Sequence, residues 1–298
     1  MTGILVVRKP VGVTSFDVVA AVRRAFRVQR VGHAGTLDPG ASGVLPVLVG
    51  EATKLMPYLL DQDKEYRVTA RFGTTTDTLD IGGRVLTRVP VGDLSREKLA
   101  SVIGQFIGRI RQVPPMYSAV HHEGQRLYEL ARRGVEVERE PRDVVVHRIV
   151  LEEVLRDTAT LTIVCGKGTY VRVLVAELGD ALGVGAVVER LVRTRVGPFT
   201  LDDAVAWEEI RAATVLGALR PPDAAIGHWP AAHLATDDAR SFVHGQSVPA
   251  AVPVSGRIRV YGPAGTLLGI GVMSPDGARI RPARVFHVDR SGTPVVRA

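Results

Sequence analysis

The sequence predicts an α+β protein with a mixed, largely antiparallel sheet, followed by a small β-barrel at its C-terminal end. Strands and helices are interspersed without the regular βαβ rhythm of a doubly wound protein. Several strand runs also follow one another closely enough to pair as hairpins. Beyond residue 228, short strands are separated by turns rich in Gly and Pro. We therefore expect two domains, residues 1–228 and residues 229–298.

The chain opens with a strand and a helix joined by a turn. Gly3–Val7 is a short apolar run typical of a strand, and Lys9–Ser15 is a turn that ends in a helix cap. The helix is indicated by apolar residues that recur at helical spacing and share one face: Phe16, Val19, Val22 and Phe26. Basic residues near its C-terminal end suit the helix dipole: Arg23, Arg24, Arg27 and Arg30.

A glycine- and proline-rich loop follows this helix. Residues 32–47 contain four glycines and two prolines, which exclude a long helix and predict a loop leading into a strand at Val44–Val49. Asp38 lies at the centre of the loop, directly before Pro39. An isolated Asp-Pro pair usually marks a turn, so the loop alone leaves open whether Asp38 does more than cap its own backbone.

The clearest strand in the sequence is Lys64–Phe72, because apolar and polar residues alternate along it. Tyr66 falls on its apolar face, so we expect the ring to be buried. Residues 74–83 are rich in turn formers, and we expect Asp77 and Asp80 to act in turns or caps. The other expected elements of the first domain are helices at residues 51–60, 95–106, 127–133, 170–182 and 207–219, and strands at residues 142–154, 158–165 and 187–196.

Two helices have recognisable N-caps, and a change of composition marks the domain boundary. Ser95 and Thr169 are the expected caps of the helices that follow them. Residues 220–234 are rich in Pro, Ala and His, and the boundary is placed within them. The strands expected beyond this boundary are Arg257–Tyr261, Leu267–Met273 and Ala283–Val288.

Composition favours a polyanionic partner. The 298 residues include 38 Lys and Arg against 31 Asp and Glu, which gives a net charge of +7 and an isoelectric point near 9.9. Arginine suits phosphate and base recognition, although a solvated basic surface would give the same numbers. No stretch reaches membrane-spanning length and no signal peptide is evident, so we expect a cytoplasmic protein.

The sequence offers little for metal or redox chemistry. Cys165 is the single cysteine, which excludes an internal disulfide and a cysteine-based zinc site. The eight histidines are scattered, and adjacent His121 and His122 would point apart on a strand. We therefore expect neither a metal nor a cofactor. No coiled coil or apolar interface helix is evident, which favours a monomer.

A second glycine-containing loop precedes the helix expected at residues 170–182. Gly166–Thr169 could bind phosphate through backbone N–H groups and Lys167, although it lacks Walker spacing and could equally be a plain turn. Arg172 lies in the first turn of that helix, where the dipole disfavours a cation. Its position therefore suggests an anionic partner, and a carboxylate would serve.

Taken together, several motifs resemble the bacterial tRNA pseudouridine synthases of the TruB type. Each motif alone is weak, but their order and joint presence are specific, and they cover about the first three quarters of the chain. The C-terminal part is similar to a PUA-type RNA-binding domain in length, placement and strand pattern. The motifs are Lys9–Ser15, Gly32–Pro39, Lys64–Val68, Thr76–Asp80, Val113–Ala119 and Gly166–Arg172.

The resemblance assigns roles to individual residues. It implies that Asp38 is the catalytic aspartate, that Tyr66 stacks on the target base, and that Arg172 pairs with the aspartate. It also implies that residues 114–134 form a loop that closes on RNA; His121 and His122 depart from the lysine-bearing sequence common there. The residues implied in binding RNA or substrate are His33, Tyr170, Leu191, Lys9 and Lys167.

The implied reaction is isomerisation of uridine to pseudouridine at position 55 in the T loop of tRNA. It involves no redox change and no net hydrolysis, and the target base must first leave its stack. The charged form of Asp38 is needed, and a nearby Arg172 would favour it. One alternative is an RNA-binding or tRNA-folding factor without turnover. Another is a glycoside hydrolase, which would need a second carboxylate that no motif supplies.

Overall fold

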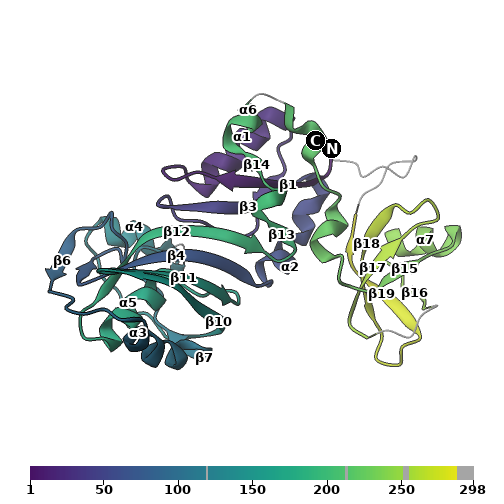
Figure 1. The fold of residues 1–298 in the computed structure, drawn as a ribbon. Helices are drawn as coiled ribbons and strands as arrows, with labels where there is room; N and C mark the ends of the chain where they lie inside the picture. The colour runs from purple at the N-terminus through teal and green to yellow at the C-terminus, as the bar shows by residue number, and fades with distance from the viewer. Residues whose placement is uncertain (119, 212–213, 251–254, 287–298) are drawn as a thin grey trace.

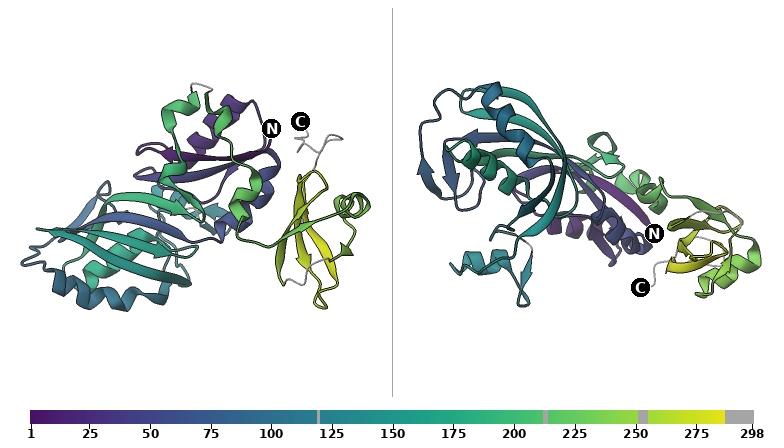
Figure 2. Two further views of the ribbon diagram at one scale, coloured as in Figure 1. Left: turned by 45° about the vertical axis from the view of Figure 1, so that its right-hand side comes forward. Right: turned by 90° about the horizontal axis from the view of Figure 1, so that it is seen from below.

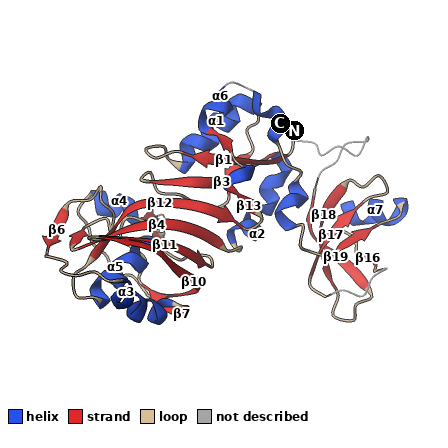
Figure 3. Cartoon of the chain, in the orientation of Figure 1, coloured by secondary structure: helices blue, strands red, loops and turns tan. Residues whose placement is uncertain are grey.

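The computed structural model describes residues 1–118, 120–211, 214–250 and 255–286. Its described part contains a ten-stranded sheet, a separate five-stranded sheet and two small hairpins (Figure 1). Helices lie beside the strands rather than alternating regularly with them (Figure 3). The structure therefore confirms the predicted α+β class.

The large sheet is mixed and largely antiparallel, as predicted. Its main path runs β14-β1-β3-β12-β4-β11-β10-β7, with β2 paired to β3 and β13 paired to β12. Only the β1–β14 and β3–β12 pairs are parallel among those described. The strands are β1 Gly3–Lys9, β2 Val31–His33, β3 Ala41–Val49, β4 Lys64–Phe72, β7 Gly108–Gln112, β10 Arg142–Leu155, β11 Thr158–Cys165, β12 Ala186–Val196, β13 Phe199–Thr200 and β14 Val205–Ala206.

Helices cover this sheet through apolar faces. α3 (Arg96–Ile103) and α5 (Val171–Ala181) share one core cluster with β4 and β11, and Leu99 and Leu174 in it are fully buried. α1 (Ser15–Phe26) packs a second cluster against β1 and β3. The alternation along β4 survives in the structure because one face of this strand meets those helices and the other does not.

Of the two N-cap residues predicted from the sequence, the structure confirms one and contradicts the other. Ser95 caps α3, since its hydroxyl accepts a hydrogen bond from the Lys98 N–H. The predicted cap at Thr169 is wrong. Tyr170 occupies the N-cap position of α5 without a side-chain cap, and the Thr169 hydroxyl instead donates to the Gly166 carbonyl at 3.1 Å.

Three predicted helices are each divided. Residues 51–60 form the 3-10 helix η1 (Gly50–Leu55) and then α2 (Met56–Leu60), because Pro57 lacks the N–H of a continuous helix. Residues 95–106 end in the 3-10 turn η2 (Gly104–Phe106) after α3. Residues 207–219 contain α6 (Trp207–Arg211) and η4 (Thr214–Ala218), and residues 212–213 lie outside the described residues.

The five-stranded sheet is a curled half-barrel in the C-terminal part of the chain (Figure 1, yellow and light green). Its order is β15-β17-β18-β19-β16, with α7 (Thr236–Val243) packed against it. The strand expected at Ala283–Val288 corresponds to β19, and the last two residues of that prediction are not described. The strands are β15 Ala231–His233, β16 Val248–Pro249, β17 Arg257–Tyr261, β18 Leu267–Met273 and β19 Arg279–Val285.

The two sheets are joined by a shared apolar cluster. Tyr261, Leu267 and Phe286 from the smaller sheet belong to the same buried cluster as Ile4 and Leu48 from the larger one. The Tyr261 hydroxyl also donates to the Asp223 carboxylate at 2.6 Å. Figure 2 shows the smaller sheet lying beside the part of the large sheet that contains the N-terminus of the chain.

The remaining elements lie at the edges of the large sheet. β5 (Thr74–Thr76) and β6 (Val85–Arg88) form one hairpin, and β8 (His121–His122) and β9 (Gln125–Arg126) form another, followed by α4 (Leu127–Arg132). The β8–β9–α4 segment stands away from the sheet in Figure 2 (right). Within the described residues, no helix is long and apolar enough to cross a membrane.

Candidate active site

Five of the eight predicted site residues line one cavity of about 250 Å³. It opens beside the loop before β3, between the start of α5 and strands β4 and β12. These segments are far apart in the sequence and meet because β12 pairs with both β3 and β4. The predicted residues in the lining are Asp38, Tyr66, Tyr170, Arg172 and Leu191.

The loop that carries Asp38 is fixed by backbone contacts on both sides. The Ser15 hydroxyl donates to the Leu37 carbonyl at 3.1 Å and accepts from the Leu37 N–H at 2.9 Å. The Gly12 N–H donates to the Pro39 carbonyl at 2.8 Å. The turn before α1 therefore braces the residues on either side of Asp38, whose side chain remains 41% exposed.

Arg172 connects Asp38 to two other segments. Its Nε lies 2.9 Å from Asp38 Oδ2, and its two terminal nitrogens donate to the carbonyls of Thr78 at 2.6 Å and Tyr117 at 2.8 Å. The Arg172 side chain is 6% exposed. A buried guanidinium needs its donors satisfied, and these contacts satisfy them in one geometry. The anionic partner expected for Arg172 from its place in the helix is thus Asp38.

Tyr66 and Leu191 enter the cavity from the sheet. Tyr66 is buried on β4 as predicted, and Leu191 lies on β12 opposite Val68. Burial raises the pKa of the Tyr66 phenol, and the nearby Arg193 guanidinium counteracts part of that rise. The phenol is therefore protonated near neutral pH. Tyr170, at the start of α5, also has its pKa raised by burial.

Three predicted residues lie outside the lining. Lys9 is fully buried, and its ammonium donates to the carbonyls of Pro10 at 2.9 Å and Val13 at 2.6 Å. Lys167 is 68% exposed on its side chain and pairs with Asp61 at 2.7 Å. His33 lies on β2, and its buried Nδ1 has no hydrogen-bond partner among the described residues. Burial, and then Arg193, lower the pKa of His33.

Sequence reasoning missed Arg193, which lies beneath the Asp38 loop. The residue is 1% exposed, and its guanidinium donates to the carbonyls of Val44 at 2.8 Å, Gly35 at 3.0 Å and Thr36 at 3.4 Å. It therefore ties both ends of the loop to β12. The available signal was its spacing, because Arg193 lies two residues after Leu191 and so on the same face of β12.

Lys64 is a second cation of the lining that the sequence did not single out. It is 6% exposed, and its ammonium donates to the Leu60 carbonyl at 2.6 Å. Burial lowers the pKa of Lys64 to about 8, and Arg193 acts in the same direction. Burial also lowers the pKa of Lys9 to about 8, with Asp38 opposing the change. The surroundings of Asp38 are therefore cationic.

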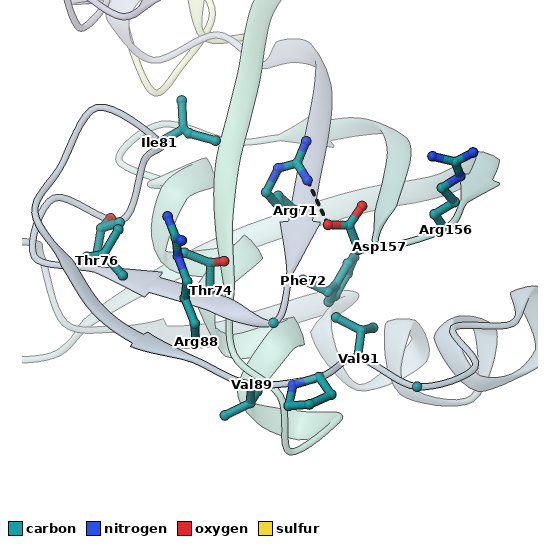
Figure 4. Close-up of a pocket in the computed structure, with 14 residues that line it drawn as sticks. Arg71, Phe72, Thr74, Thr76, Ile81, Arg88, Val89, Val91, Arg156 and Asp157 are labelled. Atoms are coloured by element: carbon teal, nitrogen blue, oxygen red, sulfur yellow. Dashed lines mark hydrogen bonds and ion pairs between the residues drawn. The ribbon is translucent and has the colours of Figure 1, made fainter.

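A larger cavity of about 870 Å³ lies elsewhere and contains none of the predicted residues (Figure 4). It lies between the β5–β6 hairpin and the ends of β4 and β11. Its one lining carboxylate, Asp157, is paired with Arg71 at 2.7 Å. Size alone would favour this cavity, but Asp157 pairs there with a partly exposed arginine, whereas the carboxylate of the smaller cavity pairs with a buried one. The smaller cavity is also lined by two further buried cations, Lys64 and Arg193.

Other acidic and nucleophilic residues have structural roles. Asp77 and Asp80 accept hydrogen bonds within their own turn, from the Arg84 N–H at 2.8 Å and the Gly82 N–H at 3.0 Å, as predicted. Cys165 is buried, and burial raises the pKa of its thiol to about 11. Over the described ranges, no group of three or more His, Cys, Asp and Glu residues could hold a metal ion.

The fold and this cavity define an α+β protein in which one partly exposed carboxylate lies among buried cations. The fold is similar to that in the crystal structure of a Cbf5-Nop10-Gar1 complex, with a TM-score of 0.73 and 26% identity. That match covers 98% of this chain and 87% of the other.

Sequence comparisons give the family. Residues 23–171 match the model for the N-terminal domain of TruB family pseudouridylate synthases. The chain is 45% identical over 295 residues to the tRNA pseudouridine synthase B of Stutzerimonas stutzeri, covering 96% of each. It is 50% identical over 246 residues to that of Symbiobacterium thermophilum, covering 82% of each. The chain therefore belongs to the TruB family of pseudouridylate synthases and is an isomerase.

The rest of the chain matches models of the same family. Residues 172–224 match the model described as tRNA pseudouridylate synthase B C-terminal domain. Residues 230–286 match the model described as Pseudouridine synthase II TruB, C-terminal. These two matches divide the chain close to the start of the five-stranded sheet at Ala231.

Proposed function

We propose that this enzyme converts uridine to pseudouridine at position 55 in the T loop of tRNA, with Asp38 as the catalytic carboxylate. The observation that carries the proposal is the 2.9 Å contact between Asp38 and the buried Arg172 at a cavity that Tyr66 also lines. The resemblance of the motifs supports the tRNA position, and the relatives named tRNA pseudouridine synthase B support tRNA as substrate.

The size of the cavity supports action on a single nucleotide. Its volume of about 250 Å³ lies below the roughly 300–1,000 Å³ typical of sites for drug-sized ligands. A base within a helical stem could not reach Asp38, so the target nucleotide must flip out of its stack. Tyr66 then offers a buried plane for the uracil ring, and Leu191 lines the same cavity. Stacking of this kind is worth about 1–3 kcal/mol per base.

The chemistry requires one bond to break and one to form between sugar and base. The bond from C1′ to N1 breaks and N1 gains a proton, the uracil rotates, a bond from C1′ to C5 forms, and C5 loses its proton. Asp38 acts in its charged form, through attack either on C1′ of the sugar, which displaces N1, or on C6 of the base, and the bond it forms breaks again before the product is released. Arg172 holds the carboxylate in place. Tyr66 is the candidate group for removal of the C5 proton; its phenol must first give up its own proton, which the neighbouring Arg193 guanidinium favours.

The remaining predicted residues act around this centre. His33 and Tyr170 are proposed to hold the flipped nucleotide. Lys167, whose side chain is 68% exposed, is proposed to bind a phosphate of the RNA. Lys9 is proposed to act on the site only through its charge near Asp38, because its ammonium already donates to the carbonyls of Pro10 and Val13. Residues 114–134 are proposed to close on RNA, and residues 229–298 to form a PUA-like RNA-binding domain. The enzyme is proposed to act as a cytoplasmic monomer.

The decisive experiment maps pseudouridine in tRNA after incubation with the purified protein. We expect the wild-type protein to modify position 55, and Asp38→Asn to fold and bind tRNA but make no pseudouridine. Asp93→Asn is the matched control, because Asp93 is exposed and outside the cavity. Substantial turnover by Asp38→Asn would remove Asp38 from the mechanism.

A tritium-release assay separates the enzyme from an RNA-folding factor. Isomerisation releases the hydrogen on C5, so tritium from 5-tritiated uridine should appear in water with the wild-type protein. A folding factor would bind the tRNA and release none. Free uracil in the product would instead indicate hydrolysis.

A further inference from the structure

Phe16 is exposed in a way that no other aromatic residue of the chain is. Its exposed fraction is 65%, whereas each of the other Phe, Tyr and Trp residues is buried or half-buried, all within the described ranges. The sequence places Phe16 on the apolar face of its helix, and the structure corrects this by leaving the ring in solvent. Val11, in the preceding turn, is 64% exposed. Neither side chain belongs to a buried core cluster.

Phe16 and Val11 are each adjacent in the sequence to a residue that is hydrogen-bonded to the loop carrying Asp38. Phe16 follows Ser15, whose hydroxyl makes both hydrogen bonds to Leu37, the residue before Asp38. Val11 precedes Gly12, whose N–H donates to the carbonyl of Pro39, the residue after Asp38. Hydrogen bonds to the backbone of the Asp38 loop therefore hold the residues adjacent to Phe16 and Val11 against that loop.

The orientation of the Phe16 ring is also defined. The Arg23 guanidinium lies 6.0 Å from the ring centroid, and it donates to the Val31 carbonyl at 3.1 Å. Val31 begins β2, the strand that carries His33. The ring therefore lies on the side of α1 that faces β2 and the start of the Asp38 loop, rather than on the far side of the helix.

We infer that Phe16 is a stacking platform for an unpaired nucleobase adjacent to the target uridine in the substrate RNA. This inference rests on the proposed function, since it deepens the RNA recognition of the same site. An exposed aromatic ring beside basic side chains is the arrangement by which proteins bind unpaired bases and their phosphates. Arg24 and Arg27, both exposed on the same helix, supply positive charge for the backbone. Once one base leaves its stack, its neighbour has lost a partner, and Phe16 replaces that partner.

The test measures binding of a T-stem-loop hairpin to variants made in the Asp38→Asn protein, so that no turnover intervenes. Phe16→Ala should weaken binding by about 5- to 140-fold, and Phe16→Leu by nearly as much, because stacking needs a π face. Phe16→Tyr should bind like the parent. Leu155→Ala is the matched control, since Leu155 is 60% exposed on the β10–β11 turn and should have no effect.

A second measurement locates the base. A hairpin with 2-aminopurine on either side of the target uridine should lose fluorescence on binding when that base stacks on Phe16, and Phe16→Ala should reverse the loss. Equal affinity and equal fluorescence for the Phe16→Ala variant and its parent would overturn the inference. Pseudouridine formation by the wild-type protein on the same hairpin is scored separately, so failure of the stacking platform and failure of the proposed function give different results.

Discussion

The Arg193→Met variant should test whether Asp38 must be held in one position to be active, because it keeps Asp38 but removes the hydrogen bonds that hold its loop. Methionine fills much of the volume of arginine but removes every hydrogen bond that the guanidinium donates. The carbonyls of Gly35 and Val44, at 3.0 and 2.8 Å, would lose a charged donor on either side of Asp38. The third contact, to Thr36 at 3.4 Å, is too long to add much.

The magnitude follows from these two contacts. A hydrogen bond from a charged donor contributes roughly 1.5–3 kcal/mol, so two contribute about 3–6 kcal/mol. Within the described residues Arg193 has no carboxylate partner, so removing this buried cation returns part of its desolvation cost and lowers the expected loss of stability to about 2–4 kcal/mol. A displacement of the carboxylate by about 1 Å typically costs on the order of 100-fold in rate. We therefore expect kcat to fall about 100-fold while the affinity for tRNA changes little.

Thermal unfolding and single-turnover pseudouridine formation are the two assays. Arg193→Lys keeps the charge but cannot span the same carbonyls, so its rate should lie between those of the wild type and the methionine variant. Arg190→Met, an exposed position on the same strand, is the matched control and should change neither measurement. A folded Arg193→Met protein with a rate within about threefold of wild type would show that the loop holds Asp38 without this residue.

Three further changes test the same site. Gly43→Ala should destabilise the protein by about 1–3 kcal/mol, because Gly43 has φ +111° and a Cβ would lie 2.2 Å from the Arg193 carbonyl; a wild-type Tm would contradict this. Tyr66→Phe should keep tRNA affinity and lose turnover, and full turnover would exclude the hydroxyl from the step at C5. Lys64→Met should flatten the rise in stability that chemical denaturation detects between about pH 8 and about pH 10.5.

The sign of the Lys64 effect follows from its lowered pKa. In the folded protein the ammonium loses its proton near pH 8, whereas in the unfolded chain it keeps the proton up to about 10.5. Below pH 8 both states are protonated, and the folded state bears the full cost of a buried charge. As the pH rises through 8, the unfolded state binds more protons, so stability increases. A variant with the slope of the wild type would assign that increase to another group, such as Lys9.

Local pattern was enough to predict most of the longer strands and most helices, but not short strands such as β2, β7 and β14. Lys64–Phe72 alternates because only one of its faces packs against helices, and such a pattern is visible in the sequence itself. Thr169 shows the limit of this reasoning. It is a preferred cap residue at the right place, yet its hydroxyl satisfies the Gly166 carbonyl in the turn, and the helix begins one residue later. Competing local hydrogen bonds of this kind have no signature in spacing.

The site itself could be predicted only in part. Resemblance singled out Asp38 and Arg172, but their contact spans 134 positions and exists because β12 lies between β3 and β4. Arg193 shares the face of Leu191, where pattern alone predicts an apolar residue. Its charge is tolerated because three loop carbonyls turn toward it, and no local rule reports where a distant loop directs its carbonyls.

The contacts of Arg172 link the Asp38 carboxylate to the segment proposed to close on RNA. One guanidinium contacts Asp38, the turn at Thr78 and the carbonyl of Tyr117, which lies within residues 114–134. Any movement of that segment that displaces Tyr117 breaks a 2.8 Å hydrogen bond to a buried charge. The Arg172 N–H group that loses the Tyr117 carbonyl must then find another acceptor, and a flipped nucleotide in the cavity would carry several. The proposed closure over RNA would therefore be coupled to the placement of Asp38 through a single side chain. The contacts of Arg172 with Asp38, Thr78 and Tyr117 account for an arginine in the first turn of a helix, where the dipole disfavours a cation.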